Sequence, residues 1–354
     1  MTPFPRPAYR PLARYAPDRR PIEVDLSDNT NRWGAHPAAL RAVREAEASD
    51  LTRYPSVYAD ALRAAIAKRF GVPVKSITTG CGSDDMLDST FRASGEPGEA
   101  IVYFPPTFSM VEVFARMNGM VPRSLPVAAI AEPARLLEGS PALVYLCRPN
   151  NPTGEVLPKK KVEHLIAAIG DDGPILLIDE AYADFADDNF LKVAAASARV
   201  LVVRTLSKAY GLAGLRVGFA VGSPRVIAEV EKSRGPYKVN CLAERAAIAV
   251  LQDREKWIPK IVSEIRAGRA RLKDELQSRG LVTLPSGANF LLLPLGDMAG
   301  GVRSAAEATA ALRELGVAVR PFPAVPGIGD TIRISIGPWE EMERFLEALD
   351  EVLT

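Results

Sequence analysis

The residues with the clearest chemical potential lie in the middle of the chain, where a lysine follows an apolar run. Residues 200–203 are all apolar, which is typical of a buried parallel strand, and Lys208 lies on the loop after them. A lysine held at the end of a strand is well placed to form an imine with an aldehyde cofactor. Thr205, Ser207 and Arg216 offer two hydroxyls and a guanidinium, which would hold a phosphate beside the lysine. The alternative is a glycine-punctuated surface loop with solvated charges.

The segment 205–218 reads Thr-Leu-Ser-Lys-Ala-Tyr-Gly-Leu-Ala-Gly-Leu-Arg-Val-Gly. It resembles the Ser-Lys-(x)n-Gly-Leu-Arg-x-Gly signature of the fold-type I pyridoxal-phosphate (PLP) aminotransferases. The resemblance implies that Lys208 carries PLP as an imine and moves a proton once it is released. It also implies that Thr205, Ser207 and Arg216 bind the cofactor phosphate.

Two further strand ends carry residues that the family uses to bind PLP. A strand near 77–79 is followed by a glycine turn and a helix start, whose free N–H groups suit a phosphate. By resemblance Gly82, Ser83 and Asp84 form the phosphate cup, although Ser83 and Asp84 could instead cap the helix. The strand 100–104 ends in Pro-Pro-Thr-Phe, and Phe108 corresponds to the aromatic residue that stacks on the pyridine ring.

Strands predicted at 142–146 and 174–178 end in the remaining cofactor candidates. The Asn-Pro-Thr-Gly motif that begins at Asn151 is characteristic of the family and implies an amide donor to the phenolic oxygen of PLP. Asp179 lies at the carboxyl end of an apolar strand, where open α/β sheets bind ligands. A buried carboxylate there needs a cation, such as a protonated pyridine nitrogen, unless Asp179 is a helix cap. By resemblance Tyr182 points to the same phenolic oxygen.

Strands that alternate with helical segments predict an α/β fold, with a mostly parallel sheet and helices on both faces. From about residue 255 the pattern changes to helices followed by short strands, at 288–295, 317–321 and 331–336. We therefore expect a PLP-binding large domain over 37–254 and a smaller α+β C-terminal domain over 255–354. Residues 1–36, rich in proline at their start, are expected to form an arm and a strand that pack with the small domain.

Two strand arginines are the predicted substrate-binding groups. In Thr-Ile-Arg-Ile-Ser-Ile, three isoleucines share one face, so Arg333 lies on the other, and the same alternation separates Arg320 from its neighbouring valines. By resemblance Arg333 clamps the anionic end of the substrate and Arg320 lies nearby; the alternative is two solvated arginines. Asn29 and Trp33 lie in a loop that lines the substrate entrance in the family. In the histidinol-phosphate aminotransferases this loop usually reads Asn-Glu-Asn-Pro-Tyr-Gly, whereas Arg32 and Trp33 replace the Pro-Tyr here.

Bulk composition narrows the class of protein. Lys and Arg total 44 against 43 Asp and Glu, which argues against nucleic acid as a partner. The three cysteines are far apart and outside any Cys/His cluster, so we expect no metal site and a reducing cytoplasm. Apolar runs fall short of the roughly 20 residues of a membrane span. Arg-Tyr-Pro before the predicted helix 59–70 matches the family, implying that Tyr54 reaches the PLP phosphate of the neighbouring subunit in a homodimer; the alternative is a capping aromatic.

Together these features predict a PLP-dependent aminotransferase of the histidinol-phosphate type. The substrates would be histidinol phosphate, or a similar amine, and the pair glutamate and 2-oxoglutarate. An aromatic amino-acid aminotransferase would use the same residues, with Arg333 on a carboxylate. A threonine-phosphate decarboxylase shares the signature but breaks a different bond. A non-catalytic PLP-binding or regulatory protein is the remaining class, and the intact Lys208 argues against it.

Overall fold

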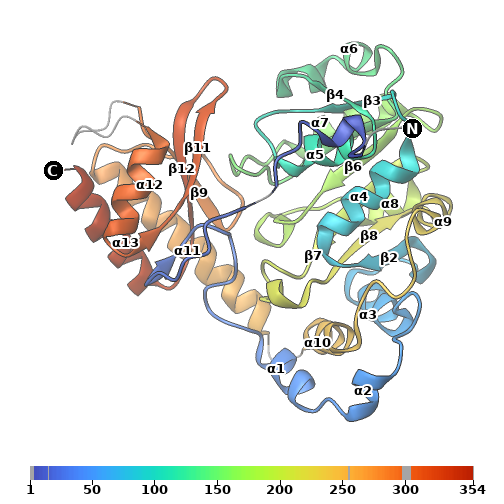
Figure 1. The fold of residues 1–354 in the computed structure, drawn as a ribbon, viewed down its shortest axis with the longest axis horizontal. Helices are drawn as coiled ribbons and strands as arrows, with labels where there is room; N and C mark the ends of the chain where they lie inside the picture. The colour runs from blue at the N-terminus through green and yellow to red at the C-terminus, as the bar shows by residue number, and fades with distance from the viewer. Residues whose placement is uncertain (1–3, 15, 254–255, 297–303, 354) are drawn as a thin grey trace.

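The computed structural model describes residues 4–14, 16–253, 256–296 and 304–353. Figure 1 shows two lobes, with the long helix α11 (Trp257–Ser278) and the N-terminal segment running between them. The predicted domain boundary at 254/255 falls outside the described residues. Within those residues, no helix has both the length and the apolar run required to cross a membrane.

A seven-stranded sheet forms the centre of the large lobe, in the order β2-β8-β7-β6-β5-β3-β4. All pairings are parallel except the two made by β8, which is antiparallel to both neighbours. The strands are β2 (Ile77–Gly80), β3 (Ala100–Tyr103), β4 (Val121–Ser124), β5 (Leu143–Cys147), β6 (Ile175–Asp179), β7 (Val200–Thr205) and β8 (Gly218–Gly222). The sequence motifs had not indicated β4 or β8, because β4 is largely exposed and β8 directly follows the Lys208 loop.

Alternation along the buried strands explains why helices cover both faces of this sheet. In β5, Val144 and Leu146 belong to one core cluster, and Tyr145 and Cys147 belong to the other. The first cluster includes residues of α3, α7, α8 and α10, and the second includes residues of α4, α5 and α9. The prediction of a mostly parallel sheet with two covered faces is confirmed. The helices of this lobe are α1 (Pro37–Arg44), α2 (Ala48–Thr52), α3 (Asp60–Phe70), α4 (Gly82–Ser94), α5 (Met110–Met117), α6 (Pro133–Leu137), α7 (Lys159–Ile169), α8 (Leu191–Ala196), α9 (Pro224–Lys232) and α10 (Cys241–Leu251).

The small lobe packs helices on a three-stranded antiparallel sheet in the order β11-β12-β9. Its elements are β9 (Phe290–Pro294), β11 (Arg320–Val325), β12 (Gly329–Ser335), α12 (Ala305–Glu314) and α13 (Trp339–Leu353), beside α11. The N-terminal segment adds β1 (Val24–Asp25), which pairs in parallel with β10 (Val317–Ala318). The prediction of one continuous strand over 317–321 is therefore wrong. The chain leaves β10 at Val319 and joins β12 from Arg320, so two separate sheets share this segment.

A buried ion cluster joins the ends of β6 and β7 on the face opposite Asp179. Arg204 Nε donates to Glu180 at 3.2 Å, and its Nη1 donates to Asp184 at 3.1 Å. The exposed fractions of the Arg204 and Glu180 side chains are 4% and 0%. Glu180 also accepts the Phe190 N–H at 2.6 Å. Because Glu180 follows Asp179 and Arg204 precedes Thr205, this cluster fixes the two strand ends that carry cofactor candidates.

We predict that Arg204→Ala lowers the free energy of unfolding by about 3–5 kcal/mol at pH 7, because Glu180 is left as an unpaired buried charge. Burial already raises the pKa of Glu180, and losing Arg204 raises it further. The deficit should shrink as the pH falls toward about 5 and Glu180 takes up a proton. Urea denaturation at both pH values tests this, with the exposed Arg225→Ala as control. An equal, small loss in both variants would contradict it.

Candidate active site

The carboxyl ends of the three central parallel strands meet below a large cavity. In register, Cys147 of β5 lies beside Asp179 of β6, which lies beside Val203 of β7. The cavity has a volume of about 670 Å³ and is lined by both lobes and the N-terminal segment. The predicted residues that line it are Asn29, Ser83, Asp84, Phe108, Asn151, Asp179, Tyr182, Thr205, Ser207, Lys208, Arg216, Arg320 and Arg333.

Asp179 lies buried at the base of this cavity. Its Oδ2 accepts a hydrogen bond from the Tyr145 hydroxyl at 2.9 Å, and its Oδ1 accepts the Ala181 N–H at 3.1 Å. Burial raises the pKa of Asp179 to about 6, although both hydrogen bonds favour the charged form. A nearby cation would stabilise the charged form of this buried carboxylate. It does not act as a helix cap, since only a short 3-10 turn, Ala183–Phe185, follows it.

Lys208 lies in the same cavity, on the loop after β7. Its Nζ donates to the main-chain oxygen of Asp28 at 3.1 Å and lies 5.7 Å from the centre of the Tyr182 ring. Burial lowers the pKa of Lys208 to about 8, and Arg333 and Arg216 lower it as well, against the charges of Asp28 and Asp84. Desolvation is the largest of these causes. At pH 7 about one amine in ten is therefore neutral, far more than for an ordinary lysine.

A third group of residues, around Arg216 and the start of α4, forms a corner of the cavity that Lys208 lines. Arg216 Nη2 donates to Asp84 at 3.2 Å, next to the start of α4. Arg216 adopts a left-handed conformation with φ of 54°, which is uncommon for a non-glycine residue and clusters at functional sites. A Cβ at Gly82 would lie 2.6 Å from the Arg216 guanidinium, and one at Gly218 would lie 2.3 Å from the Gly82 carbonyl carbon. Glycine at both positions therefore lets the α4 loop and the Lys208 loop come together.

The residues present fit PLP on these observations. A buried carboxylate with a raised pKa suits the pyridine nitrogen, and a lysine with a lowered pKa suits an aldehyde. Thr205 and Ser207 place two buried hydroxyls 2.9 Å apart near Arg216, and α4 directs its N-terminus to the same corner. The α4 helix begins at Gly82, and Asp85 rather than Ser83 or Asp84 accepts the Cys81 N–H. Ser83 and Asp84 therefore do not make this capping hydrogen bond.

Hydrogen bonds through Asn29 connect Tyr182 to the small lobe. Burial raises the pKa of Tyr182 to about 12, so its hydroxyl keeps its proton. Asn29 Nδ2 donates to that hydroxyl at 3.0 Å, and Asn29 Oδ1 accepts from the Ser335 hydroxyl at 2.9 Å. Asn289 Nδ2 donates to the Asn29 main-chain oxygen at 3.0 Å. The buried Asn29 therefore links Tyr182 in the large lobe to Asn289, directly before β9, and to Ser335 of β12 in the small lobe.

Arg333 connects the small lobe to the Asn-Pro-Thr-Gly loop. Its Nη1 donates to Asn151 Oδ1 at 2.6 Å, and its Nη2 donates to the Ser27 main-chain oxygen at 2.8 Å. Because the amide oxygen of Asn151 is engaged by the guanidinium, its amide nitrogen is directed away from Arg333. Arg320 lies directly opposite Arg333 in the β11–β12 pairing. Both arginines line the cavity, and the Arg333 guanidinium lies 5.3 Å from the centre of the Phe322 ring.

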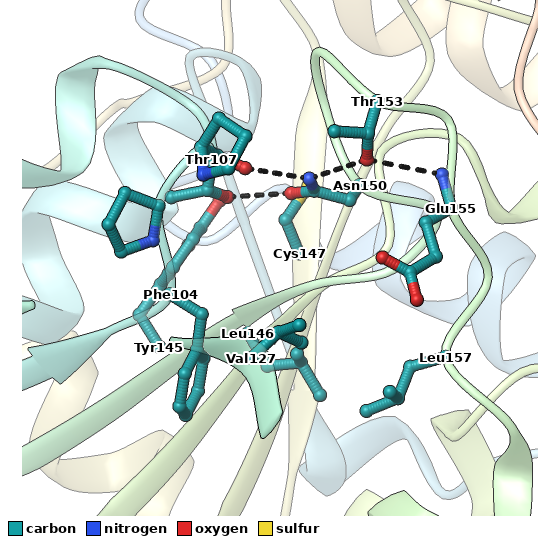
Figure 2. A pocket seen from close by; sticks show the side chains of 12 residues that line it. Phe104, Thr107, Val127, Tyr145, Leu146, Cys147, Asn150, Thr153, Glu155 and Leu157 are labelled. Atoms are coloured by element: carbon teal, nitrogen blue, oxygen red, sulfur yellow. Dashed lines mark hydrogen bonds between the residues drawn. The ribbon is translucent and has the colours of Figure 1, made fainter. Parts of the chain in front are cut away.

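Asn150, which the sequence analysis did not single out, joins the two loops that carry Phe108 and Asn151. Figure 2 shows its side chain between Thr107 and Thr153, beside a small pocket of about 50 Å³. Asn150 Oδ1 accepts from the Thr107 hydroxyl at 2.8 Å. Its Nδ2 donates to the Pro106 carbonyl and the Thr153 hydroxyl, both at 2.8 Å. These bonds fix Asn151 relative to Phe108.

Three predicted residues lie away from the cavity wall. Gly82 lies behind Arg216, as described above. Trp33 is half-buried against the main core cluster, and Tyr54 is 82% exposed and stacks on Tyr237 at 4.8 Å. Within one chain, Tyr54 therefore takes no part in the cavity. Tyr145 and Asp28 contact the predicted residues but were missed, because a tyrosine inside an apolar strand and a main-chain oxygen give no sequence signal.

Comparison with known proteins agrees with this geometry. Residues 21–349 match the family model described as aminotransferase class I and II. The histidinol-phosphate aminotransferase of Roseiflexus castenholzii is 38% identical over 348 residues, covering 94% of this chain and 91% of the relative. The aromatic amino acid aminotransferase of Thermobifida fusca is 31% identical over 357 residues, covering 97% and 96%.

A solved structure gives the same result for the fold. The histidinol-phosphate aminotransferase of Sinorhizobium meliloti, in complex with pyridoxal-5'-phosphate, superposes with a TM-score of 0.85 at 28% identity, covering 94% of this chain and 91% of that one. The predicted fold type and the predicted cofactor are confirmed by these matches. The chain belongs to the class I and II aminotransferase family and is a PLP-dependent aminotransferase.

Proposed function

We propose that this aminotransferase moves an amino group between histidinol phosphate and the pair glutamate and 2-oxoglutarate. The observation that carries the proposal is the paired arrangement of Arg320 and Arg333 on neighbouring strands at the cavity wall. A phosphate monoester offers three oxygens and more charge than a carboxylate, and two guanidiniums match it better than one. Relatives named histidinol-phosphate aminotransferase, at 30–38% identity, support the same substrate.

In this proposal PLP would lie at the base of the cavity, where most of the side chains that hold it come from one chain. Asp179 would hold the pyridine nitrogen, and Phe108 would cover the ring. Asn151 and Tyr182 would bind the phenolic oxygen. The phosphate would be bound by a group of residues around the start of α4 and the Lys208 loop, namely Gly82, Ser83, Asp84, Thr205, Ser207 and Arg216. Bound PLP supplies an electron sink for the charge left when the substrate loses its Cα proton.

Lys208 moves the proton in this scheme. A general base works best when its pKa lies near the working pH, and burial brings the amine to about 8. The bond from Nζ to the Asp28 main-chain oxygen holds the amine near the base of the cavity. The Tyr182 hydroxyl keeps its proton and can donate a hydrogen bond throughout.

The second candidate is an aromatic amino-acid aminotransferase. Phe108, Phe114 and Phe322 line the cavity and offer apolar surface for an aromatic side chain, and relatives with that name are 31–32% identical. In this case Arg333 would bind the substrate carboxylate. A panel of amino donors with 2-oxoglutarate distinguishes the two. Turnover of phenylalanine or tyrosine but not of histidinol phosphate would favour the second candidate.

We also propose a cytoplasmic homodimer in which Tyr54 completes the phosphate site of the neighbouring subunit. Its 82% exposure supports this, because so large an aromatic side chain is costly to leave in water. Leu51, Val57 and Tyr58, close by in sequence, are exposed as well. Mass measurement in solution, together with mixing of Tyr54→Phe and Lys208→Ala proteins, would test a shared site.

We predict that the ammonium of Lys208 titrates near pH 8 in the apoprotein, with the neutral amine increasing as the pH rises through this value. Arg333→Leu should raise this pKa, because the nearby guanidinium disfavours a second positive charge. NMR of ¹³C-methylated lysines, assigned with Lys208→Arg, measures both. Arg271→Leu, on the outer side of α11, is the control. A Lys208 pKa near 10.5, or one that Arg333→Leu leaves unchanged, would contradict the prediction.

A second prediction concerns substrate choice. Arg320→Ala should lower kcat/KM for histidinol phosphate more than it lowers kcat/KM for glutamate. Expressed as a free energy, the difference should be about 1.5–3 kcal/mol, because a charge-assisted bond to the extra phosphate oxygen is lost. Arg333→Ala should impair both substrates, since Arg333 also orients Asn151. Steady-state kinetics of both half-reactions measure this. Equal losses for the two substrates in Arg320→Ala would refute the phosphate argument.

A further inference from the structure

The N-terminal arm passes along the mouth of the cavity. Figure 1 shows it in dark blue, running from the 3-10 turn Pro7–Tyr9, which packs against α5, across to β1 in the small lobe. Pro17 and Arg19 line the cavity together with Arg320 and Arg333. Arg19 is therefore a third guanidinium at the same opening, contributed by a segment that belongs to neither lobe's main sheet.

Asp28 holds Arg19 at this position. Arg19 Nη1 donates to Asp28 Oδ2 at 2.7 Å, while Asp28 Oδ1 accepts from the N–H and the hydroxyl of Thr30 at 3.1 and 2.8 Å. The main-chain oxygen of Asp28 accepts the bond from Lys208. Asp28 thus contacts both the arm, through its carboxylate, and the Lys208 amine, through its main-chain oxygen. The Arg19 side chain remains 58% exposed, so it is accessible to a ligand at the opening.

The charges at this opening match a dianion. Three guanidiniums, those of Arg19, Arg320 and Arg333, and the carboxylate of Asp28 leave two net positive charges. A phosphate monoester carries about −1.5 to −2 near pH 7. Without Arg19 a single net positive charge would remain, which suits a carboxylate. The other charged groups of the cavity, around Asp84, Asp179, Lys208 and Arg216, belong to the cofactor end described above.

We propose that Arg19 is a specificity-determining residue, which selects substrates that carry a dianionic phosphate over amino acids that carry a singly charged carboxylate at the same position. The inference rests on the proposed phosphate substrate and adds the arm to its binding site. A guanidinium stays charged while it is hydrogen-bonded, so Asp28 positions Arg19 and the positive charge of Arg19 attracts an anion at the opening. Arg19 does not touch the reacting atoms, and its effect should appear in substrate binding.

The neighbouring arginine provides a matched control. Arg20 donates to Asp18 at 2.7 Å and does not line the cavity. Arg19→Met and Arg20→Met therefore remove the same charge from the same arm, one residue apart. Arg19→Lys keeps the charge. The test uses the holoenzyme, in which PLP occupies its own phosphate site, and titrates it with inorganic phosphate by calorimetry. The KM and kcat for histidinol phosphate and for phenylalanine are measured beside it.

Arg19→Met should raise the Kd for phosphate and the KM for histidinol phosphate about three- to tenfold, the range for a partly exposed charge acting on a dianion. The kcat for histidinol phosphate should stay as in the wild type, and the KM for phenylalanine should rise by a smaller factor, because its carboxylate carries a single charge. Arg20→Met should change neither constant, and Arg19→Lys should recover most of the binding.

Other outcomes separate this inference from the proposed function. Equal effects of Arg19→Met and Arg20→Met, or a loss of kcat with every substrate, would overturn the selecting role and indicate a structural one. Absence of phosphate binding to the wild type would also overturn it. If phosphate binds in an Arg19-dependent manner but histidinol phosphate is not turned over, the proposed substrate is wrong and the role of Arg19 stands.

Discussion

The burial of one carboxylate is the constraint on which the site depends. Asp179 lies at the end of a strand that is buried on both faces, and its two hydrogen bonds come from Tyr145 and Ala181. These bonds offset only part of the cost of removing the charge from water, which is why the pKa of Asp179 rises to about 6. A bound cation offsets the remainder. We infer that the fold maintains an unfavourable charge so that it can bind and keep protonated a basic ring nitrogen.

The other parts of the site follow from the way the sheet brings distant segments to this carboxylate. Parallel strands place the ends of β5, β6 and β7 together, so Asn151, Asp179 and Lys208 become neighbours although they are far apart in sequence. The antiparallel β8 then returns beside β7 and lets Gly218 lie against Gly82. Hydrogen bonds through Asn29 and Arg333 attach the small lobe to the cofactor end. The residue proposed to bind the substrate is thus hydrogen-bonded to one proposed to bind the cofactor.

Much of this arrangement could be predicted, because cofactor groups follow apolar strands and such strands are visible in one sequence. Lys208, Asp179 and Phe108 were each expected at a strand end, and all three line the cavity. The partners could not be predicted, since they depend on pairings between distant segments. Tyr145 is indistinguishable from a core residue until its strand lies beside β6. The break between β10 and β11 was missed because continuous apolar alternation does not show a change of partner strand.

The most direct test compares the stability of the apoprotein and the holoenzyme, in the wild type and in Asp179→Asn, between about pH 4 and pH 8. Because the pKa of Asp179 is higher in the folded state than its ordinary value of 3.8, wild-type apoprotein should lose stability as the pH rises from about 4 to 6. Asn lacks this charge, so the variant apoprotein should be more stable at pH 7.5, by about 2–3 kcal/mol, and gain less from PLP. Apoproteins of equal stability across this range, stabilised equally by PLP, would contradict the account.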